Sequence, residues 1–125
     1  TAEMEEIVAS HHSVAECAVI GINDELKGQI PLALVVAKSG EDIEHFQLQH
    51  EVVHLVREQI GAVASLRDVV IVQRLPKTRS GKILRKMMRS IADGEQFQVP
   101  STIDDEAIID EIRDVLEHAK IGCFK

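Results

Sequence analysis

The sequence predicts an α+β domain, in which helices pack on a small mixed sheet of about three strands plus a hairpin. Three observations support this prediction. The length of 125 residues suits a single domain with one core. A hydrophobic fraction of 45% with 28% charged residues is typical of a globular protein. Hydrophobic periodicity gives the order α, β, β, α, β, loop, α, α, which differs from the regular alternation of a doubly wound fold.

The first half of the chain contains the strongest strand signals. Apolar residues at helical spacing predict a first helix from residue 1 to residue 8, with glutamates near its N-terminus. Two β-rich runs at residues 14–22 and 30–37 predict a strand pair with a longish connection. Residues 46–60 then show helical periodicity, and Gly61 is well placed to end that helix.

The second half is predicted to contain a strand, a loop and two helices, in that order. Residues 68–73 predict a short strand, and residues 76–82 predict a polar loop. An apolar stripe from Ile83 to Ala92 predicts a helix closed by Gly94. After a connector, Asp104 is a candidate N-cap for a last helix that reaches about Lys120.

Composition excludes several classes of protein. The longest strongly apolar run has six residues, which is too short for a membrane-spanning helix or a secretory signal. Three Phe residues without Trp or Tyr, together with a net charge of −7, argue against nucleic-acid binding. Cys17 and Cys123 lack metal-ligand spacing, so we expect reduced thiols. We therefore expect an intracellular protein that binds neither membranes nor nucleic acid, processed or cut from a longer chain because it starts at Thr1.

The cations are unevenly distributed along the chain. Half of the 14 Lys and Arg residues lie between residues 74 and 92, a window without any acidic residue. One interpretation is a solvated basic face that pairs with the acidic last helix. The other is a site for a phosphate-bearing ligand, because loop cations near a helix start create a positive field. The seven cations are Arg74, Lys77, Arg79, Lys82, Arg85, Lys86 and Arg89.

A loop at residues 75–82, with the sequence LPKTRSGK, lies inside this window. It is not a P-loop, because Pro76 and Ile83 occupy positions where that motif needs Gly and Ser or Thr. Pro76 fixes one end of the loop and Gly81 loosens the other, which would place Lys82 at the boundary between loop and helix. A lysine on a mobile loop can be delivered to a reacting anion and withdrawn from it.

A second motif, at His50, Glu51 and His54, matches the zinc-hydrolase pattern H-E-x-x-H. The longer metzincin pattern would need a glycine and a third histidine where this chain has Arg57 and Ile60. Helical geometry also turns both histidines away from the apolar stripe and onto the exposed face. We therefore expect no metal at this motif. A zinc hydrolase that uses His50, Glu51 and His54 is the less favoured alternative.

Several segments resemble one enzyme family. The segment LPKTRSGKILR at residues 75–85 closely resembles the C-terminal signature of the AMP-forming acyl-CoA synthetases, in the acyl- and aryl-CoA synthetase, nonribosomal peptide synthetase and luciferase superfamily. Residues 1–36 resemble the start of that family's small C-terminal domain, and VREQIG at residues 56–61 resembles its middle helix. STIDD at residues 101–105 resembles the tail of short-chain members acting on acetate or propionate, somewhat more the latter.

This resemblance implies a two-step acid-thiol ligase. A short carboxylate, propionate or acetate, attacks ATP to give an acyl-adenylate and pyrophosphate, and the thiol of coenzyme A then displaces AMP. Residues 1–125 would form the mobile C-terminal lid domain, and the large N-terminal domain that binds ATP and substrate lies outside this sequence. ATP, with Mg²⁺, and coenzyme A would be substrates that this domain does not bind tightly. We expect the isolated domain to be inactive.

The resemblance also implies roles for individual residues. Lys82 matches the catalytic lysine, which approaches the carboxylate and the α-phosphate during adenylation. Arg57 matches a contact to the 3′-phosphate of coenzyme A. Pro76, Ser80 and Gly81 would shape the loop, with Ser80 also capping it.

A different class of function remains open. The chain could be a free-standing regulatory or interaction domain in which Lys82 is acylated, which would remove its charge. Its partners would then include a protein lysine acyltransferase and a deacylase. In either case we expect a cytoplasmic protein, or a mitochondrial matrix protein in a eukaryote.

Overall fold

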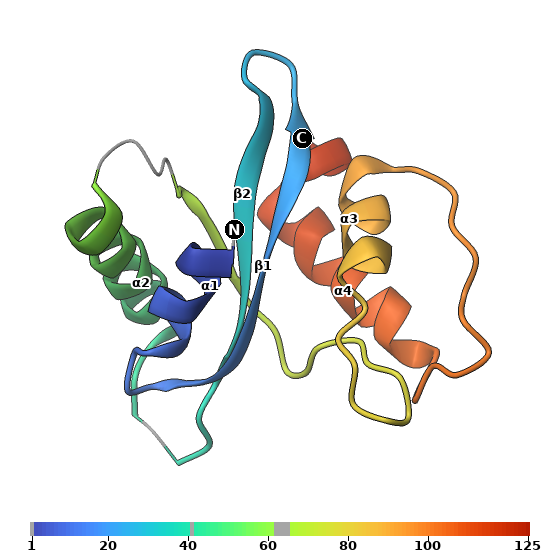
Figure 1. The fold of residues 1–125 in the computed structure, drawn as a ribbon, viewed down its shortest axis with the longest axis horizontal. Coiled ribbons are helices and arrows are strands. Elements are labelled where there is room, and N and C mark those ends of the chain that lie inside the picture. The colour runs from blue at the N-terminus through green and yellow to red at the C-terminus, as the bar shows by residue number, and fades with distance from the viewer. Residues whose placement is uncertain (1, 41, 62–65) are drawn as a thin grey trace.

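The computed structural model describes residues 2–40, 42–61 and 66–125 and arranges them in three layers, with a sheet between two helical layers (Figure 1). This architecture confirms the predicted α+β fold with a small mixed sheet. The elements in chain order are α1 (Ala2–Ala9), β1 (Val14–Asp24), β2 (Gly28–Ala37), α2 (His45–Ile60), β3 (Asp68–Ile71), α3 (Arg85–Asp93), α4 (Ala107–Ala119) and the 3-10 helix η2 (Gly122–Phe124).

The sheet has the strand order β1-β2-β3, with β2 in the centre. β1 and β2 are antiparallel, whereas β2 and β3 are parallel and are joined through α2. β3 ends at Ile71, two residues before the predicted end. None of the helices in the described part of the chain has the length and apolarity needed to cross a membrane.

The turn between β1 and β2 is shorter than the longish connection that we predicted. Only residues 25–27 separate the strands. The carboxylate of Asp24 accepts hydrogen bonds from the N–H groups of Leu26 at 3.2 Å and Lys27 at 3.0 Å, and Gly28 takes the left-handed conformation that the turn needs, with φ 82°. The bond from Lys27 holds the pKa of Asp24 below its usual value.

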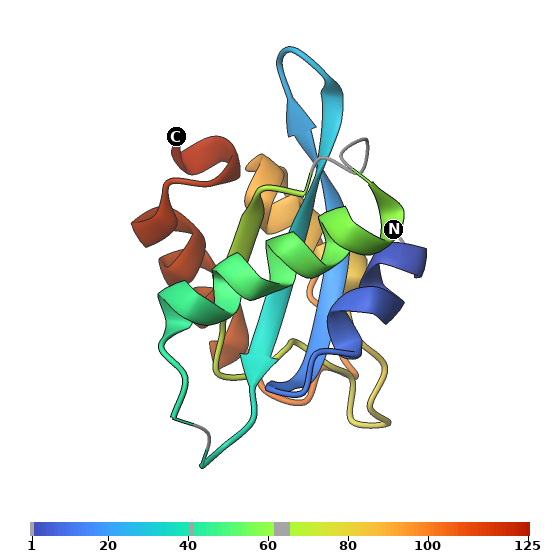
Figure 2. The same ribbon diagram turned by 90° about the vertical axis from the view of Figure 1, so that its left-hand side faces the viewer.

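Alternating side chains of the sheet build two hydrophobic cores, one on each face. One core lies under α1 and α2, and Figure 2 shows α2 crossing the sheet on that side. The other lies under α3 and α4. The central strand contributes to both, because residues 32–35 are fully buried and alternate between Leu32 and Leu34 on one face and Ala33 and Val35 on the other.

The predicted helices are present, with corrections at two N-termini. α2 ends before Gly61 and α3 before Gly94, as predicted. α3 begins at Arg85 rather than at Ile83, because Ile83 still pairs antiparallel with Lys77. The first predicted helix is present as α1, although Thr1 lies outside the described residues.

The last helix begins later than the candidate cap predicted. α4 starts at Ala107, and the carboxylate that accepts its first N–H belongs to Asp105, at 3.0 Å, not to Asp104. Its C-terminal boundary agrees with the prediction, because Lys120 ends it in a left-handed conformation.

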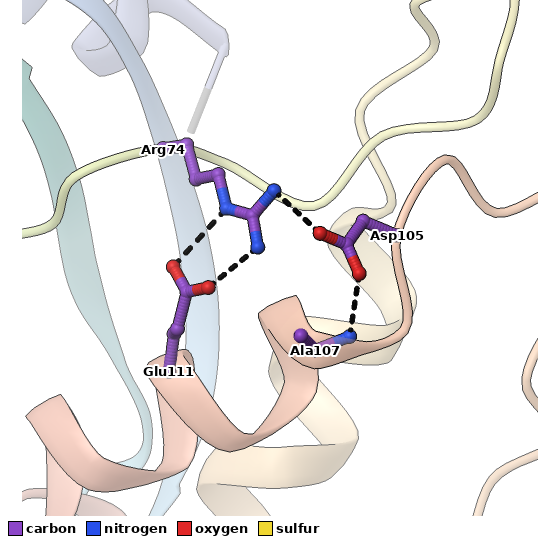
Figure 3. Close-up of polar contacts among 4 residues, drawn as sticks. All are labelled: Arg74, Asp105, Ala107 and Glu111. Carbon is purple, nitrogen blue, oxygen red and sulfur yellow. Dashed lines mark hydrogen bonds and ion pairs between the residues drawn. The ribbon is translucent and has the colours of Figure 1, made fainter.

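Arg74 joins the segment after β3 to the start of α4 (Figure 3). Its guanidinium donates two hydrogen bonds to Glu111, with Nε 3.1 Å from Oε1, and Nη1 lies 3.0 Å from Oδ2 of Asp105. A bidentate contact of this kind has a defined geometry as well as a charge attraction. The hydrogen bond from Arg74 lowers the pKa of Glu111. The pKa of Asp105 is lowered mainly by the hydrogen bond from the N–H of Ala107, and further by the hydrogen bond from Arg74.

We expect Arg74→Ala to lower the Tm of the chain by about 2–6 °C at pH 7. A carboxyl group whose pKa is lowered by folding stabilises the native state above its unfolded pKa, and this contribution disappears as pH falls through the folded pKa. The difference from wild type should therefore shrink below about pH 4. Thermal unfolding monitored by circular dichroism from pH 3 to pH 7 measures both effects.

Arg113→Ala is the matched control. Arg113 is an arginine of α4 that makes only an exposed i,i+3 ion pair, with Asp110. Its Tm should change by less than that of Arg74→Ala. Equal changes in the two variants, or a difference that persists at pH 3, would contradict the role given to Arg74.

Candidate functional site

The predicted loop is a small hairpin that leads to Lys82. Its turn is closed by backbone hydrogen bonds of 2.9 Å from Thr78 N to Lys82 O and from Gly81 N to Thr78 O. Leu84 N donates to Pro76 O at 2.9 Å, and the ring of Pro76 is fully buried. Gly81 has φ 94°, a conformation that side chains other than that of glycine rarely adopt.

Lys82 therefore lies at the end of a hairpin, three residues before α3, and not at a boundary between loop and helix as predicted. The paired backbone also differs from the loosened loop that Gly81 led us to expect. Because the main chain is fixed on both sides of Lys82, reach at this position comes from its flexible four-carbon side chain.

Thr78 is a residue of this loop that the sequence analysis missed. Its Oγ1 accepts the N–H of Lys82 at 3.1 Å and lies 2.9 Å from Oγ of Ser80. Ser80 thus contacts the loop through the side chain of Thr78. A threonine four residues before Lys82 was the available signal, because Thr hydroxyls commonly close turns by bonding nearby N–H groups.

The segment at residues 101–105 braces the hairpin from outside. Thr78 pairs antiparallel with Ile103, and Arg79 N donates to Thr102 O at 2.9 Å. The guanidinium of Arg79 also reaches the carbonyl of Ser101 at 3.3 Å. The sequence had singled out this segment for its resemblance and for a candidate N-cap, and the structure places it in direct contact with the loop.

The cations of residues 74–92 fall into two groups. Three have carboxylate partners: Arg74 binds the last helix, as one interpretation predicted, while Lys77 binds Glu16 at 2.7 Å and Arg85 binds Glu5 at 2.7 Å. Among the described residues, the other cations have no carboxylate within ion-pair distance. These are Arg79, Lys82, Lys86 and Arg89, all of them exposed.

Lys82 borders an open groove of about 780 Å³ between the start of α3 and residues 96–100. Lys86 and Ser90 line it together with the half-buried ring of Phe97. Two ammonium groups without carboxylate partners in the described residues give this groove a positive field. The arrangement can attract an anion and stabilise negative charge that develops beside Lys82.

Arg57 does not belong to this group of residues. It is exposed in the last turn of α2, on the opposite side of the sheet from α3 (Figure 1). The loop residues Pro76, Ser80, Gly81 and Lys82 are thus brought together, whereas Arg57 is separated from them by the sheet.

The three residues of the H-E-x-x-H motif lie on α2, where Glu51 is hydrogen-bonded and the two histidines are exposed. His50 and His54 are exposed, as predicted. Glu51 accepts a hydrogen bond from Nε2 of the buried His11 at 2.7 Å and another from Gln47 at 2.9 Å. Residues 2–40, 42–61 and 66–125 contain no group of three or more His, Cys, Asp or Glu side chains that could hold a metal.

Neither cysteine forms a disulfide. Cys123 is exposed and Cys17 is buried. Burial is the main cause, and the charge of Glu5 the second, of a pKa of Cys17 that is raised to about 11. The thiol is therefore protonated and poorly nucleophilic at neutral pH.

Comparison with known proteins identifies relatives along almost the whole chain. The family described as the AMP-binding enzyme C-terminal domain matches residues 3–82. The chain is 46% identical to the mitochondrial acyl-CoA synthetase short-chain family member B of Dictyostelium discoideum, covering 98% of this chain and 18% of that protein. It is 41% identical to propionate–CoA ligase of Escherichia coli, covering 94% of this chain and 19% of that protein.

A solved structure supports the same relationship. The acyl-CoA synthetase of Brucella canis is 34% identical and superimposes with a TM-score of 0.64, over 70% of this chain and 16% of that protein. The chain spans less than a fifth of the length of each of these relatives. By sequence and by fold, the chain belongs to the AMP-binding enzyme C-terminal domain family.

Proposed function

We propose that this chain is the C-terminal domain of an AMP-forming acyl-CoA synthetase. The whole enzyme would convert a short carboxylate, ATP and coenzyme A to acyl-CoA, AMP and pyrophosphate through an acyl-adenylate. The names of the relatives support a short-chain substrate, and that of the Escherichia coli relative favours propionate over acetate. A zinc hydrolase has less support, since Glu51 is engaged with His11 and Gln47.

The single observation that carries this proposal is the exposed ammonium group of Lys82 at the end of the hairpin. It has no carboxylate partner in the described part of the chain, although the neighbouring cations Lys77 and Arg85 are paired. Adenylation brings a carboxylate and the α-phosphate of ATP together, and both are anions. An ammonium group between them stabilises the charge that they share in the transition state. At an effective dielectric constant near 20, one such contact at ~4 Å amounts to roughly 4 kcal/mol.

The closed hairpin indicates how Lys82 would reach these anions. Because the loop backbone is paired and braced, we propose that residues 1–125 move as one lid over a large N-terminal domain of the same polypeptide. That domain would hold ATP with its Mg²⁺ and the carboxylate, so this chain would bind neither tightly and would be inactive alone. The enzyme would work in the cytoplasm, or in the mitochondrial matrix of a eukaryote.

Arg57 is proposed to contact the 3′-phosphate of coenzyme A in the second half reaction. Its guanidinium is exposed and can form a forked contact with a phosphate. Its place on the opposite side of the sheet from Lys82 is compatible with two half reactions that use different sides of a rotating domain.

In the full-length enzyme, we expect Lys82→Ala to lower the rate of adenylate formation by about 10²- to 10³-fold or more. Thioester formation from a supplied acyl-adenylate should be unchanged, because Lys82 is proposed to act only in the first step. Pyrophosphate exchange measures the first step, and release of AMP after addition of coenzyme A measures the second.

Lys86→Ala is the matched control, because Lys86 is exposed in the same groove and also has no carboxylate partner among the described residues. It should retain most of the adenylation rate. An equal loss in both half reactions of Lys82→Ala would show that the role of Lys82 is wrong.

Arg57→Ala should raise the KM for coenzyme A by about 10-fold and leave adenylation unchanged, because a charge-assisted contact to phosphate is lost. Initial rates at varied coenzyme A concentration give this value. Arg67→Ala, which removes another exposed arginine, is the control. An unchanged KM for coenzyme A in Arg57→Ala would refute the assignment.

The exposure of Lys82 also favours a second, regulatory function as a target of acylation. An acyltransferase would move an acyl group from acyl-CoA to Nζ, releasing coenzyme A and removing the positive charge. We expect mass spectrometry of the protein from cells to find the acyl group on Lys82 in preference to the exposed Lys120, with adenylation restored by a deacylase. Acylation spread evenly over exposed lysines would contradict a regulatory role.

A further inference from the structure

An ion pair between Glu5 and Arg85 connects the two helical layers around one edge of the sheet. Glu5 lies on α1 and Arg85 is the first residue of α3, and these helices lie on opposite faces of the sheet (Figure 1). Arg85 Nε lies 3.2 Å from Oε1 of Glu5, and Nη2 lies 2.7 Å from Oε2. Such a forked contact fixes orientation as well as distance.

Glu5 is itself held in place by the sheet. Its Oε1 accepts the N–H of Val19 at 2.9 Å, on the outer edge of β1. An edge N–H has no partner strand, so the carboxylate satisfies a buried group that would otherwise lack a hydrogen bond. The side chain of Glu5 is 23% exposed, which limits its freedom to rotate.

The other end of α3 is tied to the same strand. Asp93, the last residue of α3, accepts the N–H of Asn23 at 2.9 Å. The four residue-to-residue steps of strand from Val19 to Asn23 span about 13 Å. The eight residue-to-residue steps of helix from Arg85 to Asp93 span about 12 Å. The two lengths match, so both ends of α3 can be fixed along β1 at once, and the helix is held against sliding along its axis.

This attachment reaches Lys82 through two residues. Ile83 and Leu84 lie between Lys82 and Arg85, and both are restrained by the hairpin, through the pairing of Ile83 with Lys77 and the bond from Leu84 to Pro76. A displacement of Arg85 therefore displaces the hairpin end that bears Lys82. Among the described residues, Arg85 is the cation next to this hairpin end that is fixed to α1.

We propose that Glu5 is a positioning residue that sets the location of Lys82 through Arg85. This inference rests on the proposed role of Lys82 in adenylation. Glu5 touches no substrate in this scheme, and its effect is confined to the step in which Lys82 acts. The contact orients α3 relative to the sheet, so its loss would misplace the ammonium group and leave the second half reaction intact.

The test uses the full-length enzyme with Glu5→Ala, Arg85→Ala and the double variant. We expect each single variant to lower adenylation by about 10-fold, since a small misplacement of a catalytic group is costly. The double variant should be no slower than either single variant, because the two residues act through one contact. Thioester formation from a supplied acyl-adenylate should be unchanged in all three.

Glu6→Ala is the matched control, because Glu6 lies next to Glu5 and is exposed, and its side chain makes no hydrogen bond or ion pair among the described residues. It should leave both half reactions unchanged. If Glu5→Ala fails to fold, Glu5→Gln replaces it, because an amide oxygen still accepts the N–H of Val19 while the ion pair with Arg85 is lost. This variant should show the same selective loss of adenylation.

Three results would overturn the inference: unchanged adenylation in Glu5→Ala and Glu5→Gln, a parallel loss of both half reactions, or independent effects of Glu5 and Arg85 that multiply in the double variant. Failure of the proposed function is a separate result, because Lys82→Ala would then retain adenylation. Loss of adenylation in Lys82→Ala with full activity in the Glu5 variants would refute the positioning role alone.

Discussion

Burial of the central strand on both faces is the constraint on which the rest of the structure depends. Residues 32–35 of β2 are fully buried, and their side chains alternate between two cores. A strand of this kind needs a helical layer on each side. Helices in separate layers pack on the same sheet but do not contact one another across it, so a direct link between the layers runs around an edge of the sheet. The ion pair between Glu5 and Arg85 is such a link at the β1 edge, beside the hairpin that bears Lys82.

Features that depend on near neighbours could be predicted from the sequence. β-rich runs separated by turn residues predicted the first two strands, and glycines at the ends of periodic segments located the ends of α2 and α3. The start of α3 was misplaced because Ile83 and Leu84 are apolar and half-buried in the hairpin, so they extend the helical pattern without being helical. Apolar character reports burial, and both conformations bury these side chains.

Contacts between distant residues could not be predicted in the same way. Arg85 and Glu5 are 80 residues apart, and Arg74 and Glu111 are 37 apart. The excess of carboxylates offers each cation many possible partners, and a single sequence does not choose among them. The position of Lys82 in the chain was recognisable by resemblance, but its lack of a carboxylate partner among the described residues is a property of the fold. The same limit applies to Glu51, whose place in a catalytic pattern gave no indication that it binds the buried His11.

The ion pairs around the hairpin also leave Lys82 and Lys86 without carboxylate partners among the described residues of an acidic domain. The chain has 21 acidic residues against 14 Lys and Arg, so an exposed ammonium group has many carboxylates to attract. Lys77 engages Glu16 on one side of the hairpin, and Arg85 engages Glu5 on the other. Each pair occupies a carboxylate on the β1 and α1 side of the molecule. The backbone of the hairpin is hydrogen-bonded on both sides of Lys82, and the exposed side chain of Lys82 borders the groove.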